Sequence, residues 1–216
     1  MPNRQAGFTL VEIAIVLVII GLLLGGVLKG QELINSAKVK NFAQDFRSVP
    51  LFIYGYQDKF KALPGDDLRA DTHVGGILAT NGTRGNGVIE GSWDSTTVTH
   101  ETVLFWQHVR LANLASGSTD FTSTANASLP TNADGGRIGV QSGTPPITGM
   151  TGSYFVCSAG IQGKYAKQLD TTMDDGDTAN GSMRVGTSGS SPMAAVATTG
   201  AGGIVDGNTY TVCLAF

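Results

Sequence analysis

The chain has 216 residues, enough for one ordinary domain plus an extended element but short for two full domains. Charged residues make up 14% of it and the formal net charge is −3. It has no basic tract with interleaved aromatic residues, so nucleic-acid binding by charge is unsupported. Glycine accounts for 30 residues, and small polar residues dominate the second half, which predicts turns and short strands after the first third.

The most apolar stretch begins close to the N-terminus. Residues 8–28, FTLVEIAIVLVIIGLLLGGVL, contain a single charge, that of Glu12. As a helix this stretch would be about 31 Å long, enough to cross a hydrocarbon core of about 30 Å. A secretory signal peptide is cut after its apolar stretch, whereas here the small residues Ala6 and Gly7 precede it. The stretch is therefore predicted to remain as a membrane span.

Glu12 is unusual in such a span. A carboxylate inside lipid is costly unless it is paired or neutralised, and ionisable residues in membrane helices usually have a function. A side chain near the end of the span could instead snorkel to the interface. We favour a functional role because of the residues around Glu12.

Residues 7–12, GFTLVE, and the apolar run behind them resemble the cleavage and methylation site of type IV prepilins and type II secretion pseudopilins. The resemblance implies that a membrane peptidase cuts after Gly7 and that Phe8 becomes the N-methylated terminus. It also implies that Glu12, fifth in the mature chain, serves in assembly. The leader, residues 1–7, carries one basic side chain, Arg4, as is usual in this family.

An apolar stripe with helical spacing follows the span. The stripe residues recur at alternating steps of four and three, with polar residues between them: Phe42, Phe46, Val49, Ile53, Tyr56 and Phe60. The helix is therefore predicted to continue in amphipathic form over residues 29–62, with a kink at Pro50. The sequence LPGD at positions 63–66 should end it.

The rest of the chain predicts a globular head. Strands are expected near residues 137–141, 153–158, 182–186 and 209–216, and exposed loops over 116–136 and 188–203. An amphipathic helix is expected over 101–114, and a second helix from the steps of four between Ile161, Tyr165 and Leu169. Residues 62–106 also resemble the corresponding region of a group of bacterial prepilin-type proteins.

The fold class that these patterns and the resemblance imply is α+β and type IV pilin-like. A long N-terminal helix, half transmembrane and half amphipathic, would pack on a C-terminal antiparallel β-sheet head with Gly-rich loops. The expected division is a leader at 1–7, a transmembrane or filament-core helix at 8–28, its amphipathic continuation at 29–62 and the head at 63–216.

The two cysteines are Cys157 and Cys213. They could be buried free thiols, but a bridge is favoured in an exported protein. Pilins often carry one C-terminal disulfide, and this pair fits that habit. In residues 209–216, TYTVCLAF, the alternation places Cys213 on the face opposite to Tyr210, Val212 and Leu214.

The sequence contains no complete catalytic motif among those considered. His100-Glu101 starts like a zinc-protease motif, but Leu104 stands where the second histidine is needed. We therefore expect no enzymatic activity and no required cofactor.

An acidic cluster lies in the C-terminal third. Its residues Asp170, Asp174, Asp175 and Asp177 do not have the spacing of an EF-hand. We favour a polar helix end followed by a glycine turn. The alternative is a calcium site formed by Asp174, Asp175 and Asp177.

The function implied is that of a structural subunit of a type IV pilus-like filament, processed by prepilin peptidase and polymerised through its N-terminal helix. The alternatives are a pseudopilin of a type II secretion system and a minor tip pilin acting as an adhesion or DNA-binding module. No nucleic-acid partner is predicted for a major subunit.

The partners implied are identical or homologous pilin subunits, the prepilin peptidase and methyltransferase, and an inner-membrane assembly platform. The precursor would lie in the bacterial inner membrane with one span and its head in the periplasm. Counting basic residues alone would favour the opposite orientation, and the resemblance decides between them. The mature subunit would then join an extracellular pilus or a periplasmic pseudopilus.

Overall fold

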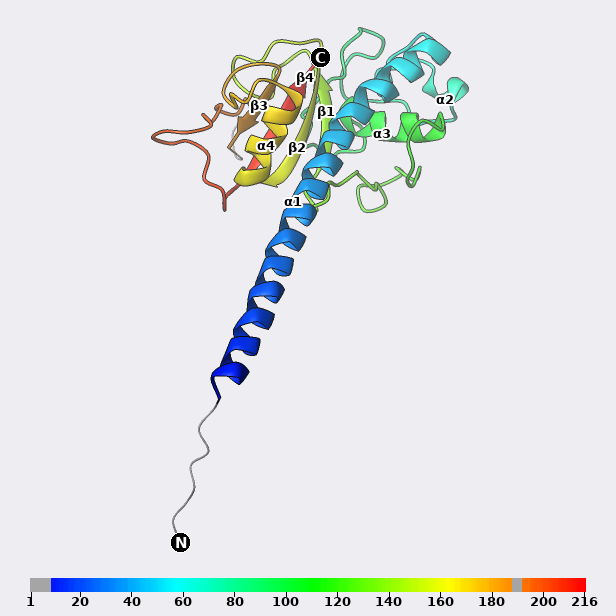
Figure 1. Cartoon of the computed structure of the whole chain (residues 1–216). Helices are drawn as coiled ribbons and strands as arrows, with labels where there is room; N and C mark the ends of the chain where they lie inside the picture. The colour runs from blue at the N-terminus through cyan, green and yellow to red at the C-terminus, as the bar shows by residue number, and fades with distance from the viewer. Residues whose placement is uncertain (1–8, 188–191) are drawn as a thin grey trace. The chain divides into compact units, whose positions relative to one another are not determined.

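The computed structural model describes residues 9–187 and 192–216 (Figure 1). Its first element is helix α1, Leu10–Phe60, which runs through Pro50 and ends two residues before the predicted limit. The chain divides into two compact units between Lys38 and Val39.

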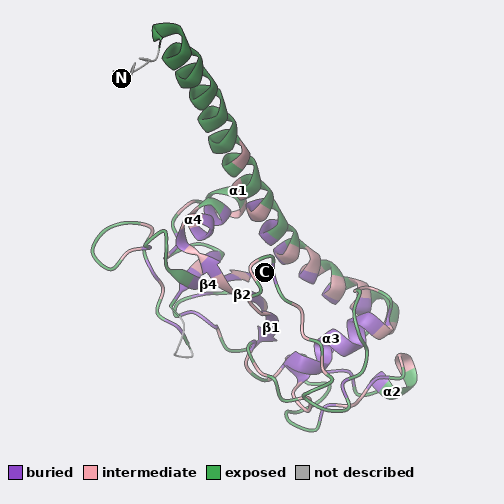
Figure 2. Ribbon diagram, turned by 90° about the horizontal axis from the view of Figure 1, so that it is seen from below, coloured by how far each residue is buried: buried purple, intermediate pink, exposed green. Residues whose placement is uncertain are grey.

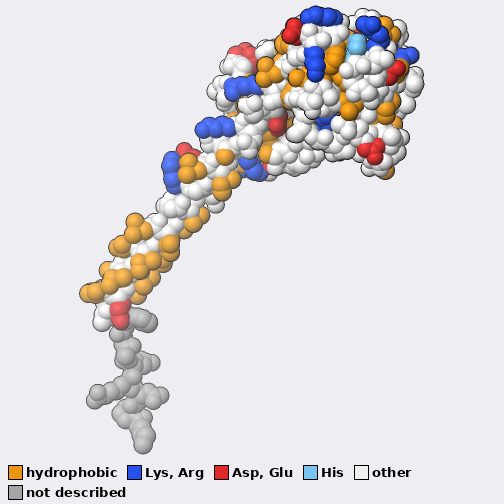
Figure 3. Space-filling view, turned by 90° about the vertical axis from the view of Figure 1, so that its right-hand side faces the viewer, with side chains coloured by type: hydrophobic (Ala, Val, Ile, Leu, Met, Phe, Trp, Pro, Cys, Tyr) orange, Lys and Arg blue, Asp and Glu red, His pale blue; other side chains and the backbone are white. Residues whose placement is uncertain are grey.

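The first unit contains the N-terminal half of α1. Its apolar side chains are exposed, and among the described helices α1 alone is long and apolar enough to cross a membrane (Figure 3). The helix continues through Gly21, Gly25, Gly26 and Gly30, so it does not unwind at these glycines. This half of α1 therefore has the length and composition of a membrane span.

The second unit has a core to which the C-terminal half of α1 contributes. Five of the six predicted stripe residues are buried: Phe42, Phe46, Val49, Ile53 and Tyr56. They lie on one side of the helix because steps of three and four return to the same face (Figure 2). In the core all of them but Tyr56 join side chains from the other helices and from the sheet.

The sheet has four antiparallel strands in the order β1-β2-β4-β3. They are β1 (Ile138–Ser142), β2 (Tyr154–Gln162), β3 (Met183–Gly186) and β4 (Thr209–Ala215). All four predicted strands are thus confirmed. The assignment of Ile161 to a helix is wrong: β2 continues past an irregularity between Ser158 and Ile161, where Gly160 has a φ of 72°, and Ile161 pairs with Tyr210.

Three short helices complete the second unit: α2 (Ala70–His73), α3 (Glu101–Leu111) and α4 (Gly163–Met173). The short α2 was not predicted. The expectation that α3 is amphipathic is wrong, because every residue from Glu101 to Arg110 is buried. Its polar side chains bond to loops instead; Gln107, for example, accepts from the Ile77 N–H at 2.8 Å and donates to the Thr119 carbonyl at 3.0 Å.

Loops cover the outer edges of the sheet. Along β1, the N–H groups of Ile138 and Ser142 donate to the carbonyls of Pro130 and Ile89 at 3.0 and 3.1 Å. Along β3, Val185 donates to the Thr178 carbonyl at 2.9 Å and accepts from Val196 at 2.8 Å. Both edge strands therefore have partners outside the sheet.

Candidate functional site

The predicted processing residues Gly7 and Phe8 lie outside the described residues. Immediately behind them, Thr9 and Glu12 form a reciprocal contact at the start of α1. The backbone N–H and the hydroxyl of Thr9 each donate to Glu12 Oε2 at 2.8 Å, and the Glu12 N–H donates to Thr9 Oγ1 at 3.2 Å. This is a capping box, which satisfies amide groups that a helix N-terminus leaves without partners.

The capping box fixes where the Glu12 carboxylate lies. Both Thr9 donors bind the same oxygen, Oε2, so within the described residues the Oε1 atom accepts no hydrogen bond. No other charged residue follows until Lys29. The carboxylate thus lies at the start of a long uncharged stretch of α1, and its Oε1 is free to accept a further hydrogen bond.

The predicted disulfide joins the two central strands of the sheet. Cys157 on β2 and Cys213 on β4 pair directly across the ladder, with 4.1 Å between their Cα atoms. Cys213 belongs to a small cluster with Trp93 and Met193, whereas Tyr210 and Val212 lie in the main core. The predicted alternation of β4 is therefore confirmed, and the bridge ties the last strand to β2.

The three calcium candidates accept hydrogen bonds from their own segment. Asp174 Oδ2 accepts from the Met183 N–H at 2.8 Å. Asp175 accepts from the Asp177 N–H at 2.9 Å, and Asp177 accepts from the Asn180 side-chain amide at 2.8 Å. Across the described ranges no three His, Cys, Asp or Glu side chains are grouped so that they could hold a metal ion.

Asp170 lies beneath this acidic segment and is fully buried. Its carboxylate oxygens have no hydrogen-bond partner by distance and angle among the described residues. Burial, and then the neighbouring acidic residues, raise the pKa of Asp170 to about 6. Asp170 therefore adds negative charge in the last turn of α4, and no described group binds its carboxylate.

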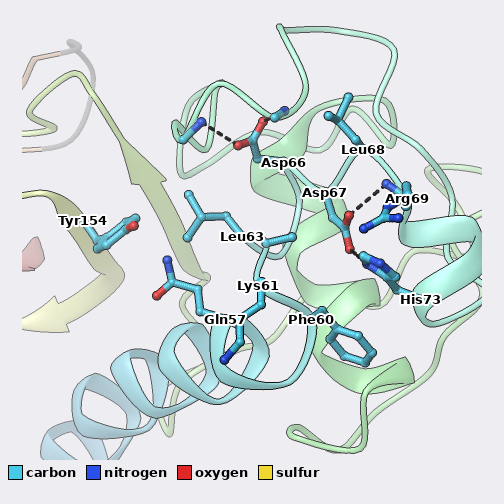
Figure 4. A pocket seen from close by; sticks show the side chains of 13 residues that line it. Gln57, Phe60, Lys61, Leu63, Asp66, Asp67, Leu68, Arg69, His73 and Tyr154 are labelled. Carbon is cyan, nitrogen blue, oxygen red and sulfur yellow. Dashed lines mark hydrogen bonds and ion pairs between the residues drawn. The ribbon is translucent and has the colours of Figure 1, made fainter.

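A cavity of about 620 Å³ opens beyond the C-terminal end of α1 (Figure 4). At its wall, Asp67 Oδ2 lies 2.8 Å from the Tyr56 hydroxyl and 2.7 Å from His73 Nδ1, and Oδ1 accepts from the Arg69 N–H at 2.9 Å. Burial opposes ionisation of Asp67, but these donors together outweigh it and lower its pKa. The carboxylate is held in place by α1 and by the short segment of residues 69–73 that follows it.

Asp66, next along the wall, binds the backbone of a glycine loop. It accepts hydrogen bonds from the N–H groups of Gly85, Asn86 and Gly87, the last at 2.8 Å. Because the oxygens of both aspartates are occupied in this way, we interpret them as anchors of the turn and loop rather than as free acid–base groups. The LPGD sequence predicted the turn but not these long-range partners.

Two further buried groups organise the same region, and the sequence did not identify them. His108 Nδ1 accepts from the Gly65 N–H at 2.9 Å while its Nε2 lies 2.8 Å from the Ile77 carbonyl, an arrangement that requires a neutral ring protonated on Nε2. Burial lowers the pKa of His108 accordingly. Glu101 Oε2 accepts a hydrogen bond from the Glu90 N–H at 2.8 Å, whereas Glu101 Oε1 has no partner among the described residues. Burial raises the pKa of Glu101 to about 7.

A serine–imidazole contact also occurs, but it is a turn contact. Ser95 Oγ lies 2.9 Å from His100 Nδ1, and the same hydroxyl accepts from the Thr97 N–H at 3.2 Å. The other ring nitrogen faces the Asn81 side-chain amide at 2.7 Å, so no carboxylate orients the imidazole. The arrangement lacks the acidic partner that a nucleophilic triad requires.

The described residues define a class of protein: an α+β chain whose N-terminal apolar helix is long enough to cross a membrane and begins at a capped carboxylate. Residues 2–28 match the family model of the prokaryotic N-terminal methylation motif. This is the prepilin-type signature of type IV pilins and pseudopilins, and the long helix with its antiparallel four-stranded sheet fits a pilin-like fold. No curated protein and no solved structure matches the chain.

Proposed function

We propose that the chain is a structural, non-enzymatic subunit of a type IV pilus-like filament. Removal of residues 1–7 after Gly7 would leave Phe8 as an N-methylated terminus, and the mature subunits would polymerise through α1. The observation that carries the proposal is the methylation motif at residues 2–28, which includes an exposed apolar helical segment with a single carboxylate, that of Glu12.

The exposed surface of α1 supports polymerisation through this helix. Large apolar side chains from Leu10 to Leu28 are between 45% and 91% exposed, far more apolar surface than a soluble monomer presents to water. Lipid would cover this surface in the precursor, and neighbouring copies of the same helix would cover it in a filament. The same segment thus serves as a membrane anchor first and as a filament core later.

Glu12 supplies a reason for ordered assembly. A carboxylate buried among apolar helices needs a cation, and the terminal amine that cleavage would create on Phe8 is such a group. Thr9 holds only one carboxylate oxygen of Glu12. We infer that the amine of a neighbouring subunit binds this carboxylate during assembly.

Two alternatives share the leader and the anchor: a type II secretion pseudopilin in a periplasmic pseudopilus, and a minor tip pilin that binds a surface or DNA. The disulfide and the long Gly-, Ser- and Thr-rich loops favour the surface pilus. Processing by a prepilin peptidase and passage through an inner-membrane assembly platform are common to all three.

Intact-mass measurement of the mature protein tests the proposal. We expect the mass of residues 8–216 plus one methyl group. A retained leader, or a cut beyond residue 20, would contradict it. Filaments sheared from cells then separate the alternatives, since a major pilin dominates them, a tip pilin is present in traces and a pseudopilin is absent.

A further inference from the structure

The cavity beyond the C-terminal end of α1 lies wholly within the second unit of the chain. Its volume of about 620 Å³ falls in the range of about 300–1,000 Å³ that is typical of small-molecule sites. Tyr154 lies at one side of the cavity and Arg69 and His73 lie at the other, with Gln57 and Leu63 between them (Figure 4). The cavity is therefore large enough for a ligand, and its walls are both polar and apolar.

The acidic groups of the wall are occupied, whereas its hydrogen-bond donors are not. Both oxygens of Asp66 and both of Asp67 accept hydrogen bonds from the protein. Arg69 is exposed and bonds to Asp67 through its backbone N–H, so within the described residues its guanidinium has no hydrogen-bond or ion-pair partner. The Lys61 ammonium pairs with Asp58 at 3.3 Å, and both side chains are exposed. The cavity thus offers donors to a ligand and few free acceptors.

The charges around the cavity balance. Asp66 and Asp67 supply negative charge to the wall, and Lys61 and Arg69 supply positive charge. A simple anion would be repelled by the two carboxylates, and a simple amine by the two cations. The wall therefore favours a neutral ligand whose oxygens accept hydrogen bonds. Hydroxyl groups meet this need, since each has two acceptor lone pairs and a hydrogen that can turn toward water.

Three aromatic side chains, Tyr154, Phe216 and Tyr54, form a row that leads away from the cavity; we call it the aromatic row. The ring centre of Phe216 lies 5.8 Å from that of Tyr154, in the cavity wall, and 6.5 Å from that of Tyr54 on α1. Tyr54 is 54% exposed and the other two are half-buried. Burial raises the pKa of Tyr154, a hydrogen bond with Gln57 opposes this, and the charges of Tyr54 and Asp66 add to it. Tyr154 therefore lies within electrostatic reach of both the row and the cavity.

Aromatic rings beside unpaired donors restrict the class of ligand. A pyranose ring carries C–H groups on its faces, which the negative face of an aromatic ring attracts, and hydroxyls around its edge. A peptide would bring backbone N–H donors, for which the wall has few free acceptors. An apolar lipid chain would cover the donors of Arg69 and Lys61 without bonding to them, which is costly. The combination fits a saccharide.

We propose that the cavity and the aromatic row bind a neutral oligosaccharide. One sugar ring would lie in the cavity, where its hydroxyls accept hydrogen bonds from Arg69 and Gln57. The next rings would lie along Tyr154, Phe216 and Tyr54. All of these residues belong to the second unit, so this binding goes beyond the proposed filament function and does not depend on it.

Saturation-transfer NMR on the full mature protein, in a detergent without sugar headgroups, tests the proposal. The probes are three neutral trisaccharides: cellotriose, maltotriose and tri-N-acetylchitotriose. We expect at least one to bind saturably with a dissociation constant below about 1 mM. Its monosaccharide should bind at least about tenfold more weakly, because one ring cannot occupy the cavity and the row together. Trigalacturonate, an anion, and the glucosamine trimer, a cation, should bind no more tightly than the neutral probes.

Two protein variants test the two ends of the site. Tyr54→Ala removes the most exposed ring of the row and should weaken trisaccharide binding at least about fivefold, whereas Tyr54→Phe keeps the ring and should bind normally. Arg69→Gln removes the unpaired donor of the cavity and should weaken binding by a similar factor. Arg47→Gln is its control, because Arg47 is exposed on α1 and does not line the cavity.

Three results would overturn the proposal. One is the absence of saturable binding for all three neutral trisaccharides. Another is binding of trigalacturonate or of the glucosamine trimer at least about tenfold tighter than that of the neutral probes, which would indicate an ion-binding site. The third is unchanged trisaccharide binding in a folded Tyr54→Ala or Arg69→Gln protein.

Discussion

The two halves of α1 contrast in how their apolar side chains are covered. Residues 10–28 are apolar on all sides, and none of the most apolar window is buried by the chain itself. Residues 39–60 present one apolar stripe that the head covers, and the other faces are mostly polar, with Leu51 and Tyr54 as exposed exceptions. A stripe can be covered by the chain's own core, whereas a helix that is apolar all round needs an environment from outside. Anchoring and assembly should therefore depend on the first half and folding on the second.

Glu12→Ala should show this separation most strongly. The variant should be processed and held in the membrane, yet its filament yield should fall at least about tenfold because the buried carboxylate–amine pair is lost. The melting temperature of the head should stay the same. Sheared-filament yield and membrane fractionation measure both effects. Asp58→Ala, an exposed carboxylate in the second half of the helix, is the control, and normal filament yield from Glu12→Ala would contradict the pairing.

Cys213→Ser should act on the head alone. By the loop-entropy model, the bridge between Cys157 and Cys213 stabilises the fold by up to about 4 kcal/mol. A chain end is otherwise prone to fray, so loss of the bridge should loosen the C-terminal third first. Protease sensitivity between Gly160 and Gly207 should rise, while cleavage after Gly7 continues. Cys157→Ser should have the same effect. Alkylation of both thiols in the unreduced mature protein would show that the bridge does not form.

Glu101→Gln should stabilise the head at high pH. The pKa of Glu101 is raised in the folded state, so the folded protein binds the proton more tightly than the unfolded chain does. The resulting stability is complete below the unfolded pKa of about 4.5 and is lost as pH rises through about 7. The gain in melting temperature of Glu101→Gln over wild type should therefore be larger at pH 8 than at pH 5, by a few degrees. A gain that is equal at both pH values, or one that the exposed-site variant Asp71→Asn reproduces, would count against this explanation.

The smallest effect is expected from calcium. Because Asp174, Asp175 and Asp177 already accept hydrogen bonds from their own segment, chelation should shift the melting temperature by less than about 1 °C. Thermal unfolding with added calcium and with chelator measures this. A larger drop with chelator that Asp175→Ala abolishes would establish the calcium site instead.

The sequence predicted those elements whose pattern is local. The stripe on α1 and the alternation in β4 follow from periodicity, and the end of α1 follows from the breaker at residues 63–66. The prediction that places Ile161 in a helix is wrong because its spacing of four residues to Tyr165 is local, whereas its pairing with Tyr210 on β4 is distant in sequence. The four residues of α2 have no side-chain cap and too short a pattern to be recognised.

The buried polar groups could not be predicted, because their partners are distant in sequence. His108 bonds to Gly65, 43 positions away, and Asp66 bonds to a loop about 20 positions away. In sequence Glu101, His108 and Arg110 are polar residues on a helix expected to be amphipathic, and no local pattern indicates that they are buried. The prepilin-type motif at the N-terminus could be recognised without such contacts, because the order of residues 7–12 and the apolar run behind them define it.

The covered edges of the sheet also bear on how copies of this chain can join. An unprotected edge strand is a template on which another chain can add a strand. Here the loops ending at Pro130 and Thr178 occupy the outer edges of β1 and β3. Two heads of this chain that meet are therefore not expected to join by adding strand to strand, which leaves their side chains to decide any contact between them.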